Sequence, residues 1–361
     1  MPISFARGAP APECLPVEEL ADCARAAVER DGTTVLSYGP AGGYRPLREW
    51  LAERHDVEPE RILLTNGSLQ GFVLLAAHVL GHGRRRVLVE SPSYDRPLLI
   101  LEELGAEIVP LPVDEDGLDV DAVEAALDEG EPPAFLYTIP TFQNPSGRTL
   151  STERRRRLVE VAAERNLLVL EDDPYGLVRF EGEAPPSLFD LDGGERVVYS
   201  SSFSKTIAPG LRVGWYVLPE GLESALEAAA TSTYITPVLL AQATVAEFLR
   251  RGRFEPNLER VTGLLRARRD AMLDALERHF PAEASWSRPE GGYFLWLELP
   301  EGSSAEVLLD AAEDEDVTFV KGSAFGGGPN TARLAFSFAS PAEIGEGVER
   351  LAALLPAAAT A

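Results

Sequence analysis

The sequence predicts an α/β protein of two domains: a large domain built on a mostly parallel mixed sheet, and a smaller α+β domain. Three observations carry this prediction. The chain has 361 residues, more than one small domain needs. Its composition, 45% apolar and 25% charged, is that of an ordinary globular protein. Short apolar runs alternate with longer stretches of helical periodicity, which is typical of a sheet with helices on both faces.

Residues 1–37 are predicted to form an N-terminal arm that packs with the small domain, and residues 38–250 the large domain. The arm is rich in proline at 10–16 and has a helical pattern at 17–30. In the large domain, strands are expected at 62–65, 87–90, 107–109, 134–138, 167–171, 197–200 and 213–217, and helices at 68–80, 94–104, 119–128 and 151–165.

Residues 251–361 are predicted to form the small domain. Long helical patterns at 221–250 and 256–280 interrupt the alternation of strands and helices. After them the sequence predicts strands at 293–298, 317–320 and 333–338, and helices at 304–315 and 341–354.

Charge, hydropathy and cysteine content exclude several classes of protein. The 58 acidic and 33 basic residues give a net charge of −25, which repels nucleic acid and anionic membranes. No apolar run approaches the roughly 18 residues of a membrane helix, and no secretion signal is visible at the N-terminus. Cys14 and Cys23 lie far from any cluster of histidines, so we expect neither a disulfide framework nor a metal site. We therefore expect a cytoplasmic protein.

Lysine is rare in this chain, since only Lys205 and Lys321 are present. Lys205 follows the strand at 197–200 and stands among small hydroxyl residues. Ligands of parallel α/β sheets bind at the carboxyl ends of strands, so this amine is placed to form a Schiff base with a carbonyl cofactor. A loop lysine exposed to solvent is the structural alternative for Lys205. It is also our first interpretation of Lys321, which could instead form a salt bridge or contact an acidic substrate near the mouth of the site.

Three other strand ends carry polar groups. Asp172 directly follows the run at 167–171. Beside a pyridinium ring, an ionised carboxylate keeps the ring nitrogen protonated, although a carboxylate at a strand end can also cap a helix or bind a metal. The segment 66–70 leads from a strand into a helix, whose free N–H groups can bind phosphate, but Ser68 is also an ordinary cap. Asn144 lies in a proline-containing turn after the strand at 134–138.

Taken together, these segments resemble the fold-type-I, pyridoxal-phosphate-dependent aminotransferases of class I/II. The motifs are Ser-Phe-Ser-Lys-Thr-Ile-Ala-Pro-Gly-Leu-Arg at 202–212, Pro-Thr-Phe-Gln-Asn-Pro-Ser-Gly at 140–147 and Glu-Asp-Asp-Pro-Tyr-Gly at 171–176. The likeness extends from residue 5 to residue 337. It is strongest to the group of 2-aminoadipate and kynurenine transaminases and MocR-type regulators. It implies an aspartate aminotransferase-like fold, pyridoxal 5′-phosphate as cofactor, and a homodimer.

The resemblance also implies roles for single residues in holding the cofactor ring. Lys205 would hold the cofactor as a Schiff base and then move the proton between Cα and C4′. Asp172 would pair with the ring nitrogen, while Tyr175 and Asn144 would hold the phenolic oxygen. Tyr94 matches the aromatic residue that stacks on the ring; its alternative is a core tyrosine.

The cofactor phosphate would be surrounded by polar groups from several segments. Arg212 is the strongest of them, because a guanidinium matches phosphate geometry. Tyr38 matches a tyrosine that reaches the phosphate of the neighbouring subunit. The other members of this set are Ser68, Leu69, Gln70, Ser202 and Ser204.

For the substrate, the resemblance implies that Arg333, with Asn144, clamps the α-carboxylate; a surface arginine is the alternative. The arm, with Arg7 and Gly8, would cover the side-chain end of the pocket. Arg7 could bind a distal carboxylate or withdraw from it, but it could equally be a surface charge. We expect amino-group transfer from acidic or large apolar or aromatic L-amino acids to a 2-oxo acid such as 2-oxoglutarate.

Three other functions are alternatives to amino-group transfer. A lyase, decarboxylase or oxidase on the same scaffold would share every cofactor contact. A fragment of a MocR-type regulator is opposed by the net charge of −25 and by the absence of a basic recognition helix before Tyr38. An α/β binding domain without chemistry would require Lys205 to be accidental.

Overall fold

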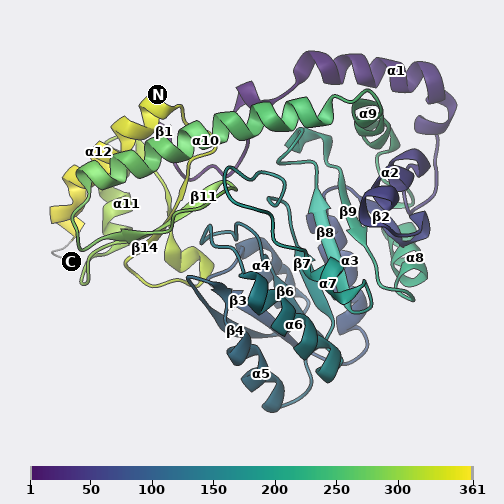
Figure 1. Ribbon diagram of the computed structural model, residues 1–361, viewed down its shortest axis with the longest axis horizontal. Helices are drawn as coiled ribbons and strands as arrows, with labels where there is room; N and C mark the ends of the chain where they lie inside the picture. The colour runs from purple at the N-terminus through teal and green to yellow at the C-terminus, as the bar shows by residue number, and fades with distance from the viewer. Residues whose placement is uncertain (1, 359–361) are drawn as a thin grey trace.

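The computed structural model describes residues 2–358 and has two parts, each with its own sheet (Figure 1). The larger part holds an eight-stranded sheet in the order β2-β9-β8-β7-β6-β3-β4-β5. These strands are β2 (Ile62–Thr65), β3 (Arg86–Ser91), β4 (Glu107–Asp114), β5 (Gly117–Leu118), β6 (Phe135–Thr138), β7 (Val169–Asp172), β8 (Val197–Ser202) and β9 (Gly214–Val217).

The direction of the strands confirms the predicted mostly parallel mixed sheet. The five strands from β8 to β4 run parallel to one another, so their carboxyl ends share one edge. Strand β9 is antiparallel to both of its neighbours, and β5 pairs antiparallel with β4 at the other edge.

Helices cover both faces of this sheet, because successive residues of each strand point to opposite sides. Leu63 and Tyr216 belong to one apolar core, with α3 and α4, and Ile62 and Trp215 to the other. The helices of the large part are α2 (Arg45–His55), α3 (Ser68–Leu80), α4 (Asp95–Glu103), α5 (Val120–Asp128), α6 (Thr152–Arg165), α7 (Leu188–Asp192), α8 (Glu223–Tyr234) and α9 (Leu239–Arg250), with short 3-10 turns at Pro59–Arg61 and Pro209–Leu211.

The structure has two helices where the sequence predicts one. The predicted helix at 221–250 is interrupted after Tyr234, where Ile235 adopts a left-handed φ of 64° and Pro237 follows. Proline lacks the N–H that a continuous helix needs and restricts the residue before it, so the chain restarts as α9.

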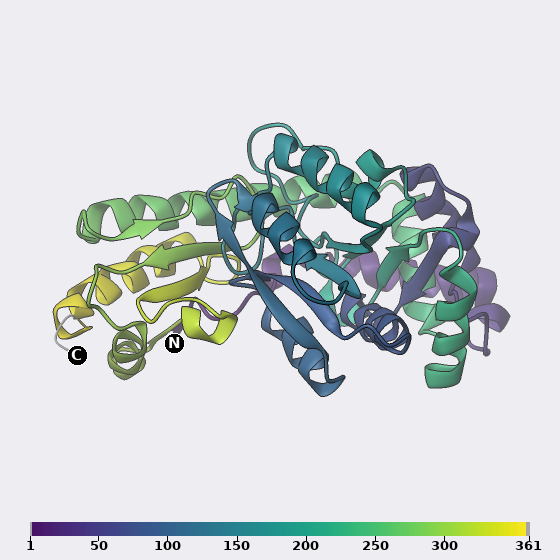
Figure 2. The ribbon, with the colours of Figure 1, turned by 90° about the horizontal axis from the view of Figure 1, so that it is seen from below.

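The smaller part is an antiparallel sheet of four strands in the order β10-β11-β14-β13, covered by three helices (Figure 2). The strands are β10 (Ser285–Trp286), β11 (Phe294–Glu298), β13 (Val320–Lys321) and β14 (Thr331–Ala335). The helices are α10 (Phe254–His279), α11 (Ala305–Asp314) and α12 (Pro341–Ala358), with a 3-10 turn at Gly322–Phe325. The predicted domain boundary near residue 250 falls between α9 and α10.

The N-terminal arm touches both parts. Strand β1 (Ile3–Ser4) pairs parallel with β12 (Val317–Thr318), and the 3-10 turn Pro12–Cys14 contacts α10. Helix α1 (Val17–Val35) instead packs along α9, at the opposite end of the molecule (Figure 1). Only the beginning of the arm therefore lies on the small part. None of the helices within residues 2–358 combines the length and the apolar character that crossing a membrane requires.

Candidate active site

A cavity of about 550 Å³ opens at the carboxyl ends of the parallel strands, where the two parts of the molecule meet. Most of the residues predicted for the site line it. They are Gly8, Ser68, Leu69, Tyr94, Asn144, Asp172, Tyr175, Ser202, Ser204, Lys205, Arg212 and Arg333. These residues come from segments as far apart in the sequence as the arm and β14, and the strand ends bring them together.

Lys205 lies on the loop after β8, with its amine inside the cavity. The Nζ atom donates a hydrogen bond of 2.8 Å to the carbonyl of Gly8 and lies 5.1 Å from the ring centre of Tyr293. Burial, together with the positive charges of Arg333 and Arg212, lowers the pKa of this amine to about 8. A free amine is therefore accessible near neutral pH, as a nucleophile or a base requires.

Asp172 ends β7 and presents one satisfied and one unsatisfied carboxyl oxygen. The hydroxyl of Tyr137 donates to Oδ2 at 2.9 Å, whereas the buried Oδ1 accepts no hydrogen bond from residues 2–358. Burial raises the pKa of Asp172 to about 7, and the bond from Tyr137 opposes this shift. Oδ1 therefore has room for a hydrogen-bond donor. A protonated pyridine nitrogen would supply both this donor and a positive charge to pair with the carboxylate, so the site fits such a ring.

The start of α3 forms a cradle for an anion. Gly67 caps the helix at a φ of 86°, and a Cβ there would collide with Nη2 of Arg212. Arg212 has a left-handed φ of 52°, which turns its guanidinium back toward this helix N-terminus. Its Nη1 lies 3.5 Å from the hydroxyl of Ser204, whose backbone N–H donates to Ser202. Helix N–H groups, hydroxyls and a guanidinium together suit a phosphate.

Arg333 lines the cavity from β14, in the small part. Its Nη1 donates to Oδ1 of Asn144 at 3.0 Å and its Nη2 to the carbonyl of Ala6 at 2.8 Å. The guanidinium also stacks 4.4 Å from the ring centre of Phe294 and 4.7 Å from that of Phe325. Its buried Nε has no partner within the described chain. Nη1 and Nη2 each carry a second N–H, so the guanidinium can still take a carboxylate.

Comparison with known proteins decides the family. The family model described as aminotransferase class I and II matches residues 11–351. The chain belongs to this family. A 2-aminoadipate transaminase of Thermus thermophilus is 43% identical over 356 residues, which cover 97% of this chain and 89% of that protein. Aromatic-amino-acid aminotransferase 1 of Thermococcus litoralis is 36% identical, with coverage of 97% and 87%.

A solved structure supports the same family. An alpha-aminoadipate aminotransferase from Thermus thermophilus, complexed with N-(5′-phosphopyridoxyl)-L-leucine, superposes with a TM-score of 0.94 at 40% identity, covering 99% of this chain and 93% of that one. This aminotransferase thus uses pyridoxal phosphate to transfer amino groups between amino acids and 2-oxo acids. The predicted family, fold, cofactor and class of reaction are confirmed, and the lyase, decarboxylase, oxidase and regulator alternatives are not favoured.

Three predicted site residues of the aminotransferase do not line the cavity. Tyr38 is 83% exposed on the surface. The side-chain oxygen of Gln70 accepts from the N–H of Asn66 at 2.9 Å. The exposed guanidinium of Arg7 stacks on Phe338 at 4.2 Å.

Two polar residues that support the site were missed by sequence reasoning. Tyr137 holds Asp172 from the neighbouring strand β6. Glu90 is buried at the end of β3 and accepts from the backbone N–H of Ile139 and from Nε2 of Gln143, which fixes the turn that carries Asn144. Glu90 is a carboxylate at the end of the apolar run 87–90, and this position was the signal from which its role could have been predicted.

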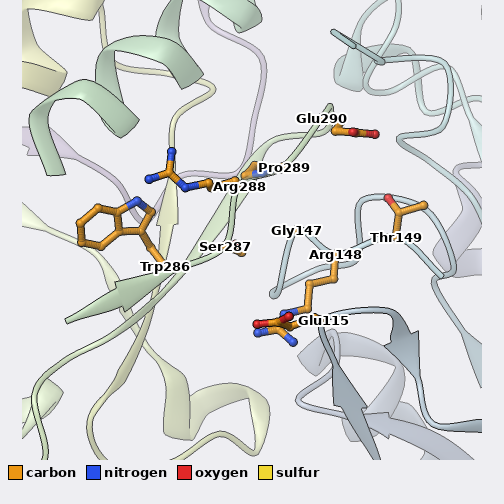
Figure 3. A pocket seen from close by; sticks show the side chains of 9 residues that line it. All are labelled: Glu115, Gly147, Arg148, Thr149, Trp286, Ser287, Arg288, Pro289 and Glu290. Atoms are coloured by element: carbon orange, nitrogen blue, oxygen red, sulfur yellow. The ribbon is translucent and has the colours of Figure 1, made fainter. Parts of the chain in front are cut away.

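The aminotransferase has a second cleft, of about 400 Å³, between the turn at 147–149 and the segment 286–290 (Figure 3). It lies between the two parts of the molecule, and none of the predicted site residues lines it. Arg288, at its rim, is engaged by Glu277 at 2.6 Å. This cleft therefore lacks the groups that the reaction needs.

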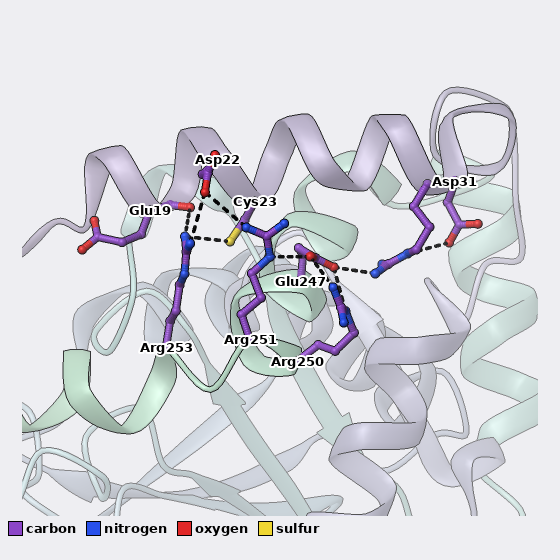
Figure 4. A network of polar contacts seen from close by, with 9 residues as sticks. Glu19, Asp22, Cys23, Asp31, Glu247, Arg250, Arg251 and Arg253 are labelled. Atoms are coloured by element: carbon purple, nitrogen blue, oxygen red, sulfur yellow. Dashed lines mark hydrogen bonds and ion pairs between the residues drawn. The ribbon is translucent and has the colours of Figure 1, made fainter.

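A cluster of charges outside both clefts serves the fold. The buried carboxylate of Glu247 on α9 accepts from Arg250 at 2.7 Å, and also from Arg251 and from Arg30 of α1 (Figure 4). These hydrogen bonds, above all the one from Arg250, lower the pKa of Glu247 to about 2. The cluster fastens α1 to α9.

Proposed function

We propose that this aminotransferase takes amino groups from both acidic and large apolar or aromatic L-amino acids and passes them to 2-oxoglutarate. Two kinds of relative support this range. The names of the relatives include 2-aminoadipate and aromatic amino acids, and one solved relative holds a phosphopyridoxyl derivative of leucine. We also propose that it works in the cytoplasm, consistent with the free thiols of Cys14 and Cys23.

The observation that carries the proposal is the shared cavity of Lys205 and Arg333. A reactive amine from the large part and a carboxylate-binding guanidinium from the small part line one cavity, so together they can hold an α-amino acid by its α-carboxylate, with Cα toward the amine. Both side chains donate to carbonyls of the arm, from Gly8 and Ala6, so the arm closes this end of the cavity.

The residues divide the work of the reaction. When bound, pyridoxal phosphate supplies an electron sink for the electron pair left on Cα. Lys205 would hold the cofactor and, once released, carry the proton away from Cα. Asp172 would keep the ring nitrogen protonated, while Tyr175 and Asn144 would hold the phenolic oxygen.

The remaining groups would position cofactor and substrate. Arg212 and the hydroxyls of Ser202 and Ser204 would bind the phosphate, together with the N–H groups at the start of α3. Tyr94 would lie against the ring. Arg333 would orient the α-carboxylate through two parallel hydrogen bonds.

A homodimer is part of the proposal. Several large apolar side chains are exposed around the loop at 36–39 and the start of α9: Leu36 (67%), Ile235 (53%) and Val238 (55%), beside Tyr38. The backbone of Val238 donates to Asn66, so this patch borders the phosphate cradle. Burial of the patch against a second copy would bring Tyr38 toward the partner's cradle.

The experiment is a half-reaction. Holoenzyme mixed with glutamate, 2-aminoadipate, leucine or phenylalanine, with no oxo acid present, should accumulate the amine form of the cofactor and one equivalent of the matching 2-oxo acid. A lyase or decarboxylase would release product without converting the cofactor. Absence of conversion with either class of donor would refute the proposed substrate range.

A further inference from the structure

One arginine that lines the cavity has no role in the proposed function. Three arginines line it: Arg96, Arg212 and Arg333. Arg212 stands at the phosphate cradle, and Arg333 is fixed by Asn144 and Ala6. Arg96 lies in the first turn of α4, two residues after Tyr94, which faces the same cavity.

Arg96 is free to take a ligand. Its only ion pair within the described residues is with Asp95, where Nε lies 3.5 Å from Oδ2, and its side chain is 59% exposed. No hydrogen bond within residues 2–358 engages its guanidinium. A solvent-exposed ion pair of this kind contributes about 0–1 kcal/mol, so an incoming carboxylate can displace it.

We propose that Arg96 binds the distal carboxylate of acidic donors and of 2-oxoglutarate, with Asp95 as its counter-ion when no such group is present. The proposal rests on the proposed function and names the residue that distinguishes its two substrate classes. A dicarboxylic substrate held by Arg333 at one end would meet a second planar fork at the mouth of the same cavity.

The other cations near the mouth are engaged elsewhere. The guanidinium of Arg7 stacks on Phe338 and does not line the cavity. Lys321 pairs with Glu306 on α11 and is likewise absent from the lining. Arg96 is therefore the side chain that the geometry offers for a distal carboxylate.

The same arrangement accommodates apolar side chains. Arg96 has a long stem at an exposed position, so it can turn toward solvent and keep Asp95 as its partner. The cavity lining also includes apolar residues, namely Ile139, Phe294, Val320, Ala324 and Phe325. A leucine or phenylalanine side chain would pack against residues of this set.

The test compares Arg96→Gln with Arg165→Gln in the donor half-reaction of the holoenzyme. Arg165 is an exposed arginine on α6 that pairs with Asp128, so the control makes the same change of charge away from the cavity. We expect Arg96→Gln to lower the ratio of kcat/KM for glutamate to that for leucine by about 10- to 100-fold, the loss of a charge-assisted pair. Arg165→Gln should leave the ratio within about twofold of wild type.

Two further measurements keep the outcomes distinct. The Kd of the unreactive dicarboxylate glutarate, measured by calorimetry on the holoenzyme, should weaken by about tenfold or more in Arg96→Gln. Arg96→Lys, which keeps the charge but loses the fork, should give an intermediate ratio. An unchanged ratio and an unchanged Kd would overturn the role of Arg96. If the wild-type enzyme converted neither donor, the proposed function would fail, and glutarate binding would still decide the inference.

Discussion

Replacing Asp172 by asparagine removes the charge on the proposed partner of the ring nitrogen while keeping the shape of the side chain. An asparagine can hydrogen-bond to the nitrogen but cannot hold it protonated. Two opposite charges about 3 Å apart interact by about 5–6 kcal/mol at an effective dielectric constant of about 20. If most of this is lost in the transition state, the half-reaction should slow by about 10³- to 10⁴-fold.

The assay is a single-turnover half-reaction with glutamate, followed by the absorbance change of the cofactor. Asp173→Asn is the matched control, because Asp173 accepts from Tyr199 and from the N–H of Gly176 and does not line the cavity. A rate near that of wild type in Asp172→Asn, or an equal loss in Asp173→Asn, would refute this reasoning.

The Asp172→Asn substitution should stabilise the folded, cofactor-free protein although it lowers activity. Burial raises the pKa of Asp172 to about 7, above its ordinary value, so the folded protein binds this proton more tightly than the unfolded chain does. In the cofactor-free protein, the contribution of Asp172 to stability therefore falls as the pH rises from about 4 to about 7. Asp172→Asn should raise the Tm of the cofactor-free protein at pH 8, while a lower Tm would show that its slow turnover reflects damaged folding.

Three other perturbations address the Schiff-base lysine, the dimer and the buried charge cluster. Lys205→Ala should abolish turnover but leave weak cofactor binding through the phosphate cradle, and borohydride reduction of wild type should label Lys205; a label on Lys321 would contradict the assignment. The wild-type enzyme should sediment as a dimer at micromolar concentration, and Ile235→Asp should shift it toward monomers with loss of activity, whereas a fully active wild-type monomer would exclude composite sites. Glu247→Gln should lower the Tm at pH 7 by several degrees. Because the pKa of Glu247 is about 2 in the folded protein, the difference in Tm from wild type should shrink as the pH falls from about 4.5 toward 2. A difference in Tm that does not depend on pH would exclude the charge of Glu247 as its cause.

The sequence predicted the position of the site because its polar residues follow apolar strand runs. Lys205, Asp172 and Asn144 stand at strand ends that a parallel sheet places on one edge. Periodicity does not give the direction or the order of strands, so neither the reversal of β9 nor the pairing of β6 with β7 could be derived. For that reason the contact of Tyr137 with Asp172 was missed.

The places of other residues depend on contacts distant in the sequence. Arg7 and Arg96 are both arginines near family motifs, but only packing decides that the first stacks on Phe338 and the second faces the cavity. The break at Ile235 had a local signal in Pro237, which the helical periodicity of the flanking residues masked.

The contacts of the arm bear on how tightly a substrate can be held. Two carbonyls of the arm, from Ala6 and Gly8, already accept from the guanidinium of Arg333 and the amine of Lys205. A substrate carboxylate that takes over the guanidinium of Arg333 replaces an acceptor that the chain itself supplies, so the number of hydrogen bonds changes little. The affinity is then the difference between two hydrogen-bonded states, so a carboxylate gains less than it would from an unpaired guanidinium. Such a site favours release, which an enzyme that must admit an amino acid and an oxo acid in turn requires at every cycle.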